Sequence, residues 1–382
     1  MDKLEFKNGY LWLKLREMKH KFTYQDYEPR MKLAMERYKV CEEKKSEEKI
    51  KKEIALCKKY WGCFPLHYFR YNLYRKDMEL SQAELINYVP EFLFYNLFLH
   101  YYPGEQYSVM LNDKNIMEQL FRSVEINQPH TICKLINGRL YSSDLKSKSF
   151  YEVYCELMEK QYEKIFVKPV DGKGGQGILI FHLSEGNKYV NDSIEFDENI
   201  LIEIGKKNNY IIQKGINQRE EISKIYPNSV NTFRIATENK KGKTRVVCSA
   251  LRIGKGGNEV DNASQDGIVV GIDSVTGKCM DYACTEKTEI FYEHPDTKFI
   301  FKNYEFVDWN SIKNLALDAA KKLPQFTYLG WDIALAEEGP LAIETNLDFG
   351  LDLYQIALGG LKEAFNITDP EKYWKFRGEN FG

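Results

Sequence analysis

Three oxygen-bearing side chains fall in one predicted β-hairpin, GWDIALAEEGPLAIETNLDFG. Asp332 lies on the first strand, Glu344 and Asn346 lie two residues apart on the second, and the turn is expected at residues 338–340. Residues two apart share one face of a strand, so Asp332 can lie opposite the other two. Hard Mg²⁺ prefers a few carboxylate oxygens together with phosphates and water. The pattern predicts a magnesium site, and a structural hydrogen-bonded glutamate is the alternative.

A glycine-rich loop follows a strand that carries a lysine. The segment EKIFVKPVDGKGGQGILIF gives a strand with Lys168, then the loop, then a second strand. Glycines let backbone N–H groups approach phosphate oxygens, and the lysine adds positive charge to the same anion. No helix follows the glycines, which excludes a Walker A loop and a dinucleotide fingerprint. A phosphate-binding loop and a hairpin without a ligand both fit. The loop glycines are Gly172, Gly174, Gly175 and Gly177.

Two arginines are expected on neighbouring strands. In VNTFRIAT, strand alternation places Thr232 and Arg234 on one face, and Arg252 lies in the next strand, SALRIG. Asn262 borders the strand after that. Two such arginines can clamp a transferring phosphoryl group or a substrate carboxylate. Solvated strand arginines are the alternative.

A further strand, YIIQKGINQ, leads into a polar break and carries Gln213 and Lys214. The backbone edge after such a strand could hydrogen-bond a planar base. On this segment alone, an ordinary core strand is the favoured interpretation.

The elements that position these residues change character along the chain. Residues 1 to about 60 are rich in Lys and Glu, and residues 60 to about 110 are aromatic; both stretches read as helical. From about residue 113, helix and strand patterns alternate. We therefore expect an α+β protein with three regions, at residues 1–110, 111–215 and 216–382.

Composition limits the classes of function. The 382 residues carry a net charge of only −2, so no overall field calls for nucleic acid. Eight cysteines without a CxxC pair are typical of reduced thiols in a cytoplasmic protein, and no stretch reaches the ~20 apolar residues of a membrane span. The basic arm at residues 1–60 fits a plain solvated face better than contact with a membrane surface or an acidic partner, which is the alternative.

In chain order, the motifs resemble the ATP-grasp superfamily, and more narrowly its sugar-transfer-associated branch, which is similar to α-L-glutamate ligases. They are Asp113-Lys114, Lys168 with its glycine loop, QKG, NTFRI, ALRIG with VDN, and Asp332 with ExN. The resemblance runs from about residue 65 to about 365. Lys214 departs from it, because a glutamate is common there, and so does Gln265-Asp266-Gly267, where paired glycines are usual.

The resemblance implies a role for each matched residue. The implied ATP-binding residues are Lys114, Lys168, Gly172, Gly174, Gly175, Gly177, Gln213 and Lys214. The implied catalytic residues, which stabilise the transferring phosphoryl group or hold substrate, are Arg234, Arg252 and Asn262. The implied metal ligands are Asp332, Glu344 and Asn346.

The resemblance also implies an ATP-grasp fold, in which two α+β lobes grip the nucleotide, preceded here by an N-terminal helical region. The implied activity is an ATP-dependent carboxylate–amine ligase that uses Mg²⁺, forms an acyl phosphate and releases ADP and phosphate, in cell-surface polysaccharide tailoring or biosynthesis. Its substrates would be a small-molecule or glycan carboxylate and an amine. The alternatives are an ATP-dependent phosphotransferase and a nucleotide-binding scaffold without catalysis. The oligomeric state stays open.

Overall fold

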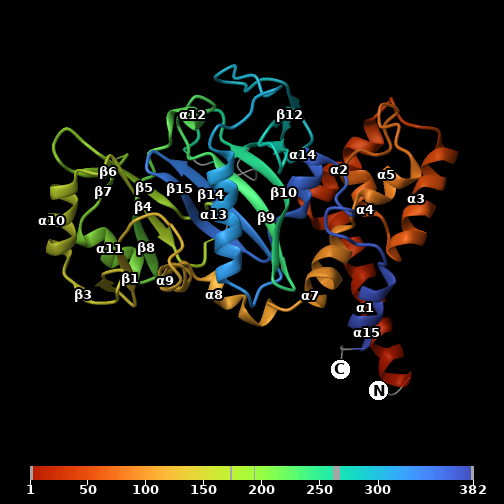
Figure 1. Cartoon of the computed structure of the whole chain (residues 1–382), viewed down its shortest axis with the longest axis horizontal. Coiled ribbons are helices and arrows are strands. Elements are labelled where there is room, and N and C mark those ends of the chain that lie inside the picture. The colour runs from red at the N-terminus through yellow and green to blue at the C-terminus, as the bar shows by residue number, and fades with distance from the viewer. Residues whose placement is uncertain (1–2, 173, 193, 260, 262–266, 380–382) are drawn as a thin grey trace.

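The computed structural model covers the whole chain and describes residues 3–172, 174–192, 194–259, 261 and 267–379 (Figure 1). Before the first strand the described chain is helical, as expected. Its α-helices are α1 (Lys3–Phe22), α2 (Pro29–Val40), α3 (Glu47–Trp61), α4 (Leu66–Arg70), α5 (Gln82–Asn87), α6 (Glu91–Leu93), α7 (Leu99–Tyr101), α8 (Val109–Asn112) and α9 (Lys114–Ser123). Short π-helical segments occupy Thr23–Tyr27 and Phe94–Phe98, and a 3₁₀ turn occupies Glu105–Tyr107.

An eight-stranded sheet forms the first lobe, at the left in Figure 1. Its order is β3-β2-β1-β8-β4-β5-β6-β7, and the neighbouring strands pair antiparallel. Its strands are β1 (Thr131–Ile136), β2 (Arg139–Tyr141), β3 (Ser147–Lys148), β4 (Lys164–Pro169), β5 (Leu179–Leu183), β6 (Tyr189–Asn191), β7 (Ile194–Glu195) and β8 (Tyr210–Lys214). The helices α10 (Phe150–Lys160) and α11 (Glu198–Gly205) belong to this lobe.

A seven-stranded antiparallel sheet forms the second lobe, in the order β13-β12-β11-β10-β9-β14-β15. Its strands are β9 (Thr232–Lys240), β10 (Lys243–Ile253), β11 (Ile268–Ile272), β12 (Cys279–Cys284), β13 (Ile290–Phe291), β14 (Tyr328–Ala336) and β15 (Gly339–Asn346). The helices here are α12 (Glu220–Ser223), α13 (Trp309–Lys322) and α14 (Leu351–Leu358), whereas α15 (Glu371–Glu379) packs beside α1 in the N-terminal helical region. The fold is thus α+β, with an N-terminal helical region before two sheets.

Alternation along β9 and β14 separates the two faces of the second sheet. Phe233, Ile235 and Trp331 are buried with the apolar side of α13. Arg234, which lies between Phe233 and Ile235, and Asp332, which follows Trp331, therefore point to the opposite face. The sheet buries one apolar face and turns a row of charged side chains toward the other.

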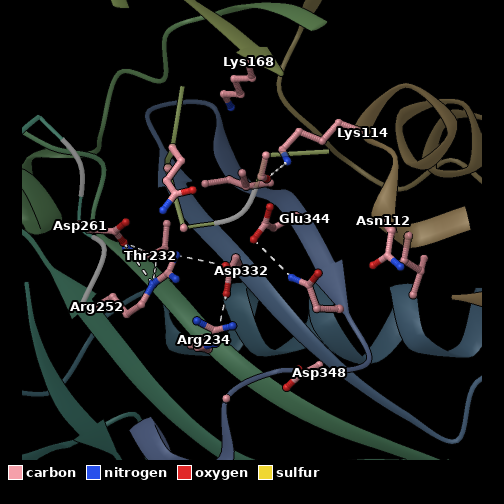
Figure 2. Close-up of a pocket in the computed structure, with 18 of the residues that line it drawn as sticks. Asn112, Lys114, Lys168, Thr232, Arg234, Arg252, Asp261, Asp332, Glu344 and Asp348 are labelled. Atoms are coloured by element: carbon pink, nitrogen blue, oxygen red, sulfur yellow. Dashed lines mark hydrogen bonds and ion pairs between the residues drawn. The ribbon is translucent and has the colours of Figure 1, made fainter. Parts of the chain in front are cut away.

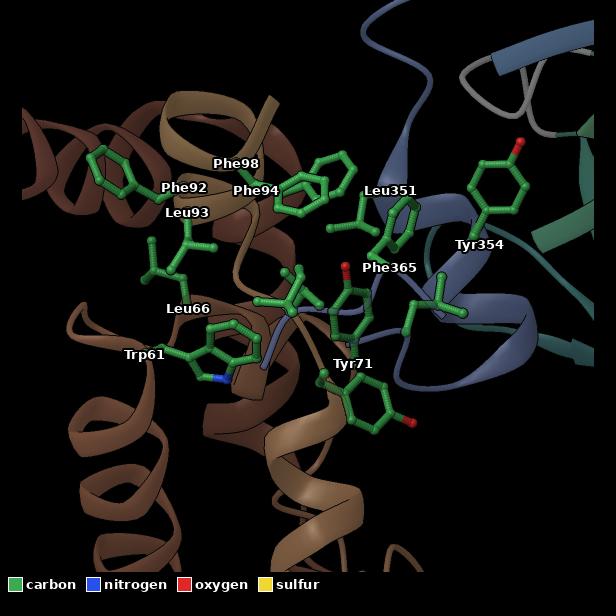
Figure 3. Close-up of a cluster of buried hydrophobic side chains, with 14 of the residues drawn as sticks. Trp61, Leu66, Tyr71, Phe92, Leu93, Phe94, Phe98, Leu351, Tyr354 and Phe365 are labelled. Atoms are coloured by element: carbon green, nitrogen blue, oxygen red, sulfur yellow. The ribbon is translucent and has the colours of Figure 1, made fainter. Parts of the chain in front are cut away.

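The N-terminal helical region does not form a core by itself. Trp61, Phe94 and Phe98 pack in one buried cluster with Phe349 and Phe365 from the C-terminal part of the chain (Figure 3). Phe94 and Phe365, for example, have ring centroids 5.0 Å apart in an edge-on arrangement. The first hundred residues are therefore fixed against the end of the second lobe, beside the charged face of its sheet.

Candidate active site

A cavity of about 870 Å³ lies between the two lobes and reaches the N-terminal helices. The first lobe contributes Lys168 and the glycine loop, and the second contributes the charged face of its sheet (Figure 2). Cavities of this size typically hold a small molecule or cofactor, oriented by a few polar groups. Most of the predicted site residues line it, although they come from segments far apart in the sequence.

Three charged residues stand in one row across the second sheet. Arg234 on β9 pairs with Asp332 on β14, and Asp332 pairs with Glu344 on β15. Residues directly opposite each other in a ladder share a face, so all three point into the cavity. Arg234 Nε lies 3.6 Å from Asp332 Oδ1. The row places a guanidinium beside two neighbouring carboxyl groups.

A one-residue irregularity sets the last step of this row. Ile333 pairs with Ala342, whereas Asp332 pairs with Glu344, so Ile343 is an extra residue in β15. The turn itself is Glu337-Glu338, since Ala336 pairs with Gly339; the expected turn at residues 338–340 was wrong by one position. Without the extra residue, Asp332 would face Ile343 and Glu344 would point to the other face.

Arg252 is held by a buried network that the sequence only partly indicated. Its Nε and Nη2 donate to Thr232 Oγ1 at 3.1 and 2.9 Å, and Nη2 donates to Asp332 Oδ2 at 3.1 Å. Asp261 accepts hydrogen bonds from the backbone N–H and the hydroxyl of Thr232, and lies 3.5 Å from Arg252 Nε. Burial acts against the charged form of Arg252, but Asp261 and Asp332 raise its pKa, so the guanidinium stays cationic. Asp261 is the central residue of the expected VDN motif, and it was missed as a site residue.

The carboxyl groups of Asp332 and Glu344 fit a divalent cation. Burial, and then the negative charge of Asp332, raise the pKa of Glu344. Burial acts to raise the pKa of Asp332 too, but Arg234 and Arg252 hold it below its usual value. Asp332 Oδ1 is buried and has no hydrogen-bond partner among the described residues. Asn346 Nδ2 donates to Glu344 Oε1 at 3.3 Å, which places an amide beside the pair.

No group of three or more His, Cys, Asp or Glu side chains within the described ranges has the arrangement of a metal centre. Asp332, Glu344 and Asn346 offer two carboxylates and an amide, which is a smaller set of ligands than such a centre has. Mg²⁺ is commonly held by one or two carboxylates together with substrate phosphates, because it keeps part of its water shell. The residues present thus suit a metal that arrives with a phosphate ligand.

Lys168 faces the carboxyl pair from the first lobe. It lies on β4, and its Nζ donates to Gln213 Oε1 on the neighbouring strand β8 at 3.0 Å. Burial of the ammonium lowers its pKa from 10.5 to about 8, although Glu344 acts to raise it. An anionic ligand would complete the neutralisation of this lysine. Gln213, one of the implied ATP-binding residues, thus has its side chain on Lys168 at the wall of the cavity.

Lys114 is positioned by the start of α9. Asp113 caps this helix by accepting the backbone N–H groups of Asn115 and Ile116. Lys114 Nζ then reaches the glycine loop, where it donates to the carbonyl of Gly172 at 2.6 Å. The loop and the lysine therefore meet at one end of the cavity (Figure 2).

The glycine loop is built as its sequence indicated, between the antiparallel strands β4 and β5. Gly174 and Gly175 have φ of +62° and +74°, a region that other residues rarely adopt. A Cβ on Gly172 would lie 2.7 Å from Pro169 Cγ and 3.0 Å from the carbonyl oxygen of Gln176. The backbone at Gly172 is thus packed closely, and Gly172, Gly174 and Gly175 line the cavity.

The predicted site residues fall into three groups. Those lining the cavity are Lys114, Lys168, Gly172, Gly174, Gly175, Gln213, Lys214, Arg234, Arg252, Asp332, Glu344 and Asn346. Gly177 belongs to the same loop, with φ of +73°, but is not among the lining residues. Asn262 lies outside the described residues.

The N-terminal helical region adds a second compartment that sequence reasoning missed. Arg70 is buried and pairs with Glu91 at 2.8 Å and with Asp352 on α14. Arg30 also pairs with Asp352, at 3.2 Å, and with Glu286, at 3.0 Å. All five line the same cavity as the glycine loop. No local sequence pattern could have identified this compartment, because its partners come from distant parts of the chain: Arg70 and Asp352 are 282 residues apart.

Comparison with known proteins gives a family and some distant structural likenesses. No curated protein matches the sequence. Among solved structures, D-alanyl-alanine synthetase A from Vibrio cholerae is 10% identical, with a TM-score of 0.41 over 71% of this chain and 68% of that chain. D-alanine–D-alanine ligase from Bacillus anthracis is 16% identical, with a TM-score of 0.37 over 71% of this chain and 67% of that chain. D-alanine–D-alanine ligase from Coxiella burnetii is 11% identical, with a TM-score of 0.39 over 72% of this chain and 62% of that chain.

The sequence model of one family, described as sugar-transfer associated ATP-grasp, matches residues 95–368. The matched range holds both lobes and every predicted site residue, and it extends over more than half of the 382 residues. The resemblance that the order of the motifs indicated is confirmed: the chain belongs to the sugar-transfer associated ATP-grasp family.

Proposed function

We propose that this protein is an ATP-dependent carboxylate–amine ligase that acts through an acyl phosphate. One observation carries the proposal: two lysines and a glycine loop face the Arg234–Asp332–Glu344 row across a single cavity. Lys114 and Lys168 supply positive charge for a triphosphate, and the loop supplies backbone amides. Asp332, Glu344 and Asn346 would hold Mg²⁺, which neutralises phosphate charge when it is bound.

The first step transfers the γ-phosphoryl group to the carboxylate substrate. A carboxylate oxygen attacks the γ-phosphorus, the bond from that phosphorus to the bridging oxygen breaks, and ADP leaves. Arg252 and Arg234 are positioned to stabilise the charge on the transferring group, because Asp261, Thr232 and Asp332 hold them on the sheet face. Such chemistry depends on positioning and electrostatics and requires no protein nucleophile.

In the second step, the amine nitrogen attacks the acyl carbon, the bond to the phosphate oxygen breaks, and the amine loses a proton. We place the amine in the compartment of the N-terminal helices. Four carboxyl groups of Glu91, Glu286, Asp348 and Asp352 line this end of the cavity with two guanidinium groups, so it suits a cation. Burial raises the pKa of Glu91 and of Glu286, as a group that accepts the amine proton requires.

The family description supports a role in tailoring sugars, and we propose that the carboxylate belongs to a uronic acid or another glycan acid. ATP as co-substrate fits a reaction in the cytoplasm. No helix within the described ranges has the length and apolarity needed to cross a membrane.

Hydroxylamine trapping tests the proposal. The protein is incubated with Mg²⁺·ATP, hydroxylamine and a panel of uronic acids, and both ADP and hydroxamate are measured. An acyl phosphate gives one hydroxamate for each ADP with at least one acid, and Arg252→Lys reduces both. ADP formation with a phosphoester and no hydroxamate would identify a phosphotransferase. Nucleotide binding without turnover of any acid or alcohol would favour the scaffold alternative.

A further inference from the structure

The first helix, α1, uses one face to dock on the rest of the protein. Gly9 lies against the backbone of Gly378 on α15, so closely that a Cβ would be 2.3 Å from the Gly378 carbonyl oxygen. One turn further, Leu13 is fully buried, and after another turn Glu17 Oε1 accepts the backbone N–H of Phe64 at 3.1 Å. Residues spaced by four share one side of a helix, so this is the inner face of α1.

The opposite face of α1 carries an apolar stripe in contact with solvent. Leu11, Leu15, Met18 and Phe22 are 59%, 55%, 52% and 55% exposed. Their spacing of four, three and four residues puts them in one line along the helix, turned about half a revolution from Gly9 and Leu13. Trp12, which is 42% exposed, borders this stripe. Single exposed apolar residues are ordinary, but four in a line mark an interaction surface.

The charge around the stripe is positive. From Gly9 to Phe22, α1 carries Lys14, Arg16, Lys19 and Lys21 against one acid, Glu17. Arg16 and Lys19 are exposed. Figure 1 shows α1 and α15 side by side at one extremity of the molecule, close to both chain ends, where α1 is accessible to a large partner.

We propose that α1 docks this protein on an anionic lipid surface, with the stripe defined by Leu11, Leu15, Met18 and Phe22 at the headgroup level. Apolar residues backed by Lys and Arg are the composition of helices that lie in a membrane interface, and tryptophan favours this depth. A second copy of the chain suits the stripe less well, because pairing α1 with itself would bring like charges together. The helix lies on the membrane, since no described helix could span one.

Vesicle flotation with the full chain tests this inference. The probes are vesicles of phosphatidylcholine alone and vesicles with a third of phosphatidylglycerol. We expect flotation with the anionic vesicles at low salt, weaker flotation as salt rises, and a blue shift of Trp12 fluorescence that Trp12→Phe removes. Leu15→Glu should reduce the partition coefficient by about tenfold or more, because it replaces an apolar side chain that would enter the membrane by one with the same sign of charge as the lipids.

The matched control is Val307→Glu, which makes the same kind of change at a residue that is 87% exposed in the second lobe. It should float like the wild type. Thermal melts of both variants check that each still folds. We expect melting temperatures close to that of the wild type, because Leu15 and Val307 lie outside the buried cores. Equal flotation of Leu15→Glu and the wild type, or no flotation with anionic vesicles, would overturn the proposal. So would a dimer in sedimentation that Leu15→Glu dissociates, because a second copy would then occupy the stripe. Nucleotide binding is independent of all these outcomes.

Discussion

Asp332 and Glu344 lie directly opposite each other because Ile343 is an extra residue in β15. The two-residue turn Glu337-Glu338 alone would pair Asp332 with Ile343 and turn the Glu344 carboxyl to the α13 side of the sheet. The irregularity brings a second carboxyl to the row that starts at Arg234. The proposed magnesium site therefore depends on one backbone feature as well as on its side chains.

The first prediction concerns Glu344→Gln. Mg²⁺·ATP at ~100 times its Kd should stabilise the wild type by about 2.7 kcal/mol and raise its Tm by a few degrees. Glu344→Gln should lose most of this shift, while its stability without ligand stays equal or rises, because the raised pKa of Glu344 means that its charged form is unfavourable. Differential scanning calorimetry measures both quantities.

Asp318→Asn, an acid-to-amide change on the exposed face of α13, is the control and should keep the full shift. If Glu344→Gln kept the full metal-dependent shift, the cation would have to bind elsewhere.

The second prediction is proton uptake when nucleotide binds. Burial lowers the pKa of Lys168 from 10.5 to about 8, and a bound triphosphate should raise it again. At pH values above about 8 and below the raised pKa of the complex, Lys168 is mostly neutral in the free protein and charged in the complex. Nucleotide affinity should therefore fall as pH rises above about 8, with uptake of up to one proton.

Calorimetry of ATP binding without Mg²⁺, in two buffers of different ionisation enthalpy, measures this proton directly. Lys168→Met should bind weakly with no uptake, and Lys206→Met, on the surface of the first lobe, should behave like the wild type. Equal uptake by Lys168→Met would assign the proton to another group.

The third prediction concerns the Arg252 network. Arg252→Met should cost about 3–5 kcal/mol of unfolding free energy, because it leaves Asp261 buried without its cation and Asp332 with Arg234 alone. Adding Asp261→Asn should recover part of this loss, since one uncompensated charge is removed. Urea unfolding of both variants measures the coupling. Arg75→Met breaks an exposed pair with Asp77 and should cost about 1 kcal/mol or less. A loss of that small size for Arg252→Met would mean that its carboxyl partners are satisfied in another way.

The fourth prediction concerns Gly172→Ala. The added Cβ would lie 2.7 Å from Pro169 Cγ and 3.0 Å from the carbonyl oxygen of Gln176. The loop would therefore have to shift, which would disturb the hydrogen bond from Lys114 to the Gly172 carbonyl. We expect a higher KM for ATP with a smaller change in kcat, because the loop binds phosphate rather than the acyl group. Gly186→Ala, where the nearest atom would be 3.9 Å away, should leave both constants unchanged. Steady-state kinetics on an acid found by hydroxylamine trapping checks this, and equal constants for both variants would argue against a phosphate-binding loop.

The sequence by itself determined which residues were available and in what order. The strand with Lys168, the glycine loop, the arginine strands and the Asp332 hairpin each follow from local alternation and turn chemistry, and together they indicated the family that the comparison confirmed. The start of α9 at Lys114 is also a local feature, because its cap, Asp113, acts within one turn.

Only the tertiary structure decided how these parts meet. The pairing of Asp332 with Glu344 depends on a ladder irregularity that no local period encodes. Asp261 joins Arg252 through a loop contact, and Arg70 with Asp352 brings the N-terminal helices to the same cavity across 282 residues. Periodicity reports which side of an element is apolar, whereas register and long-range partners are set by how separate elements pack.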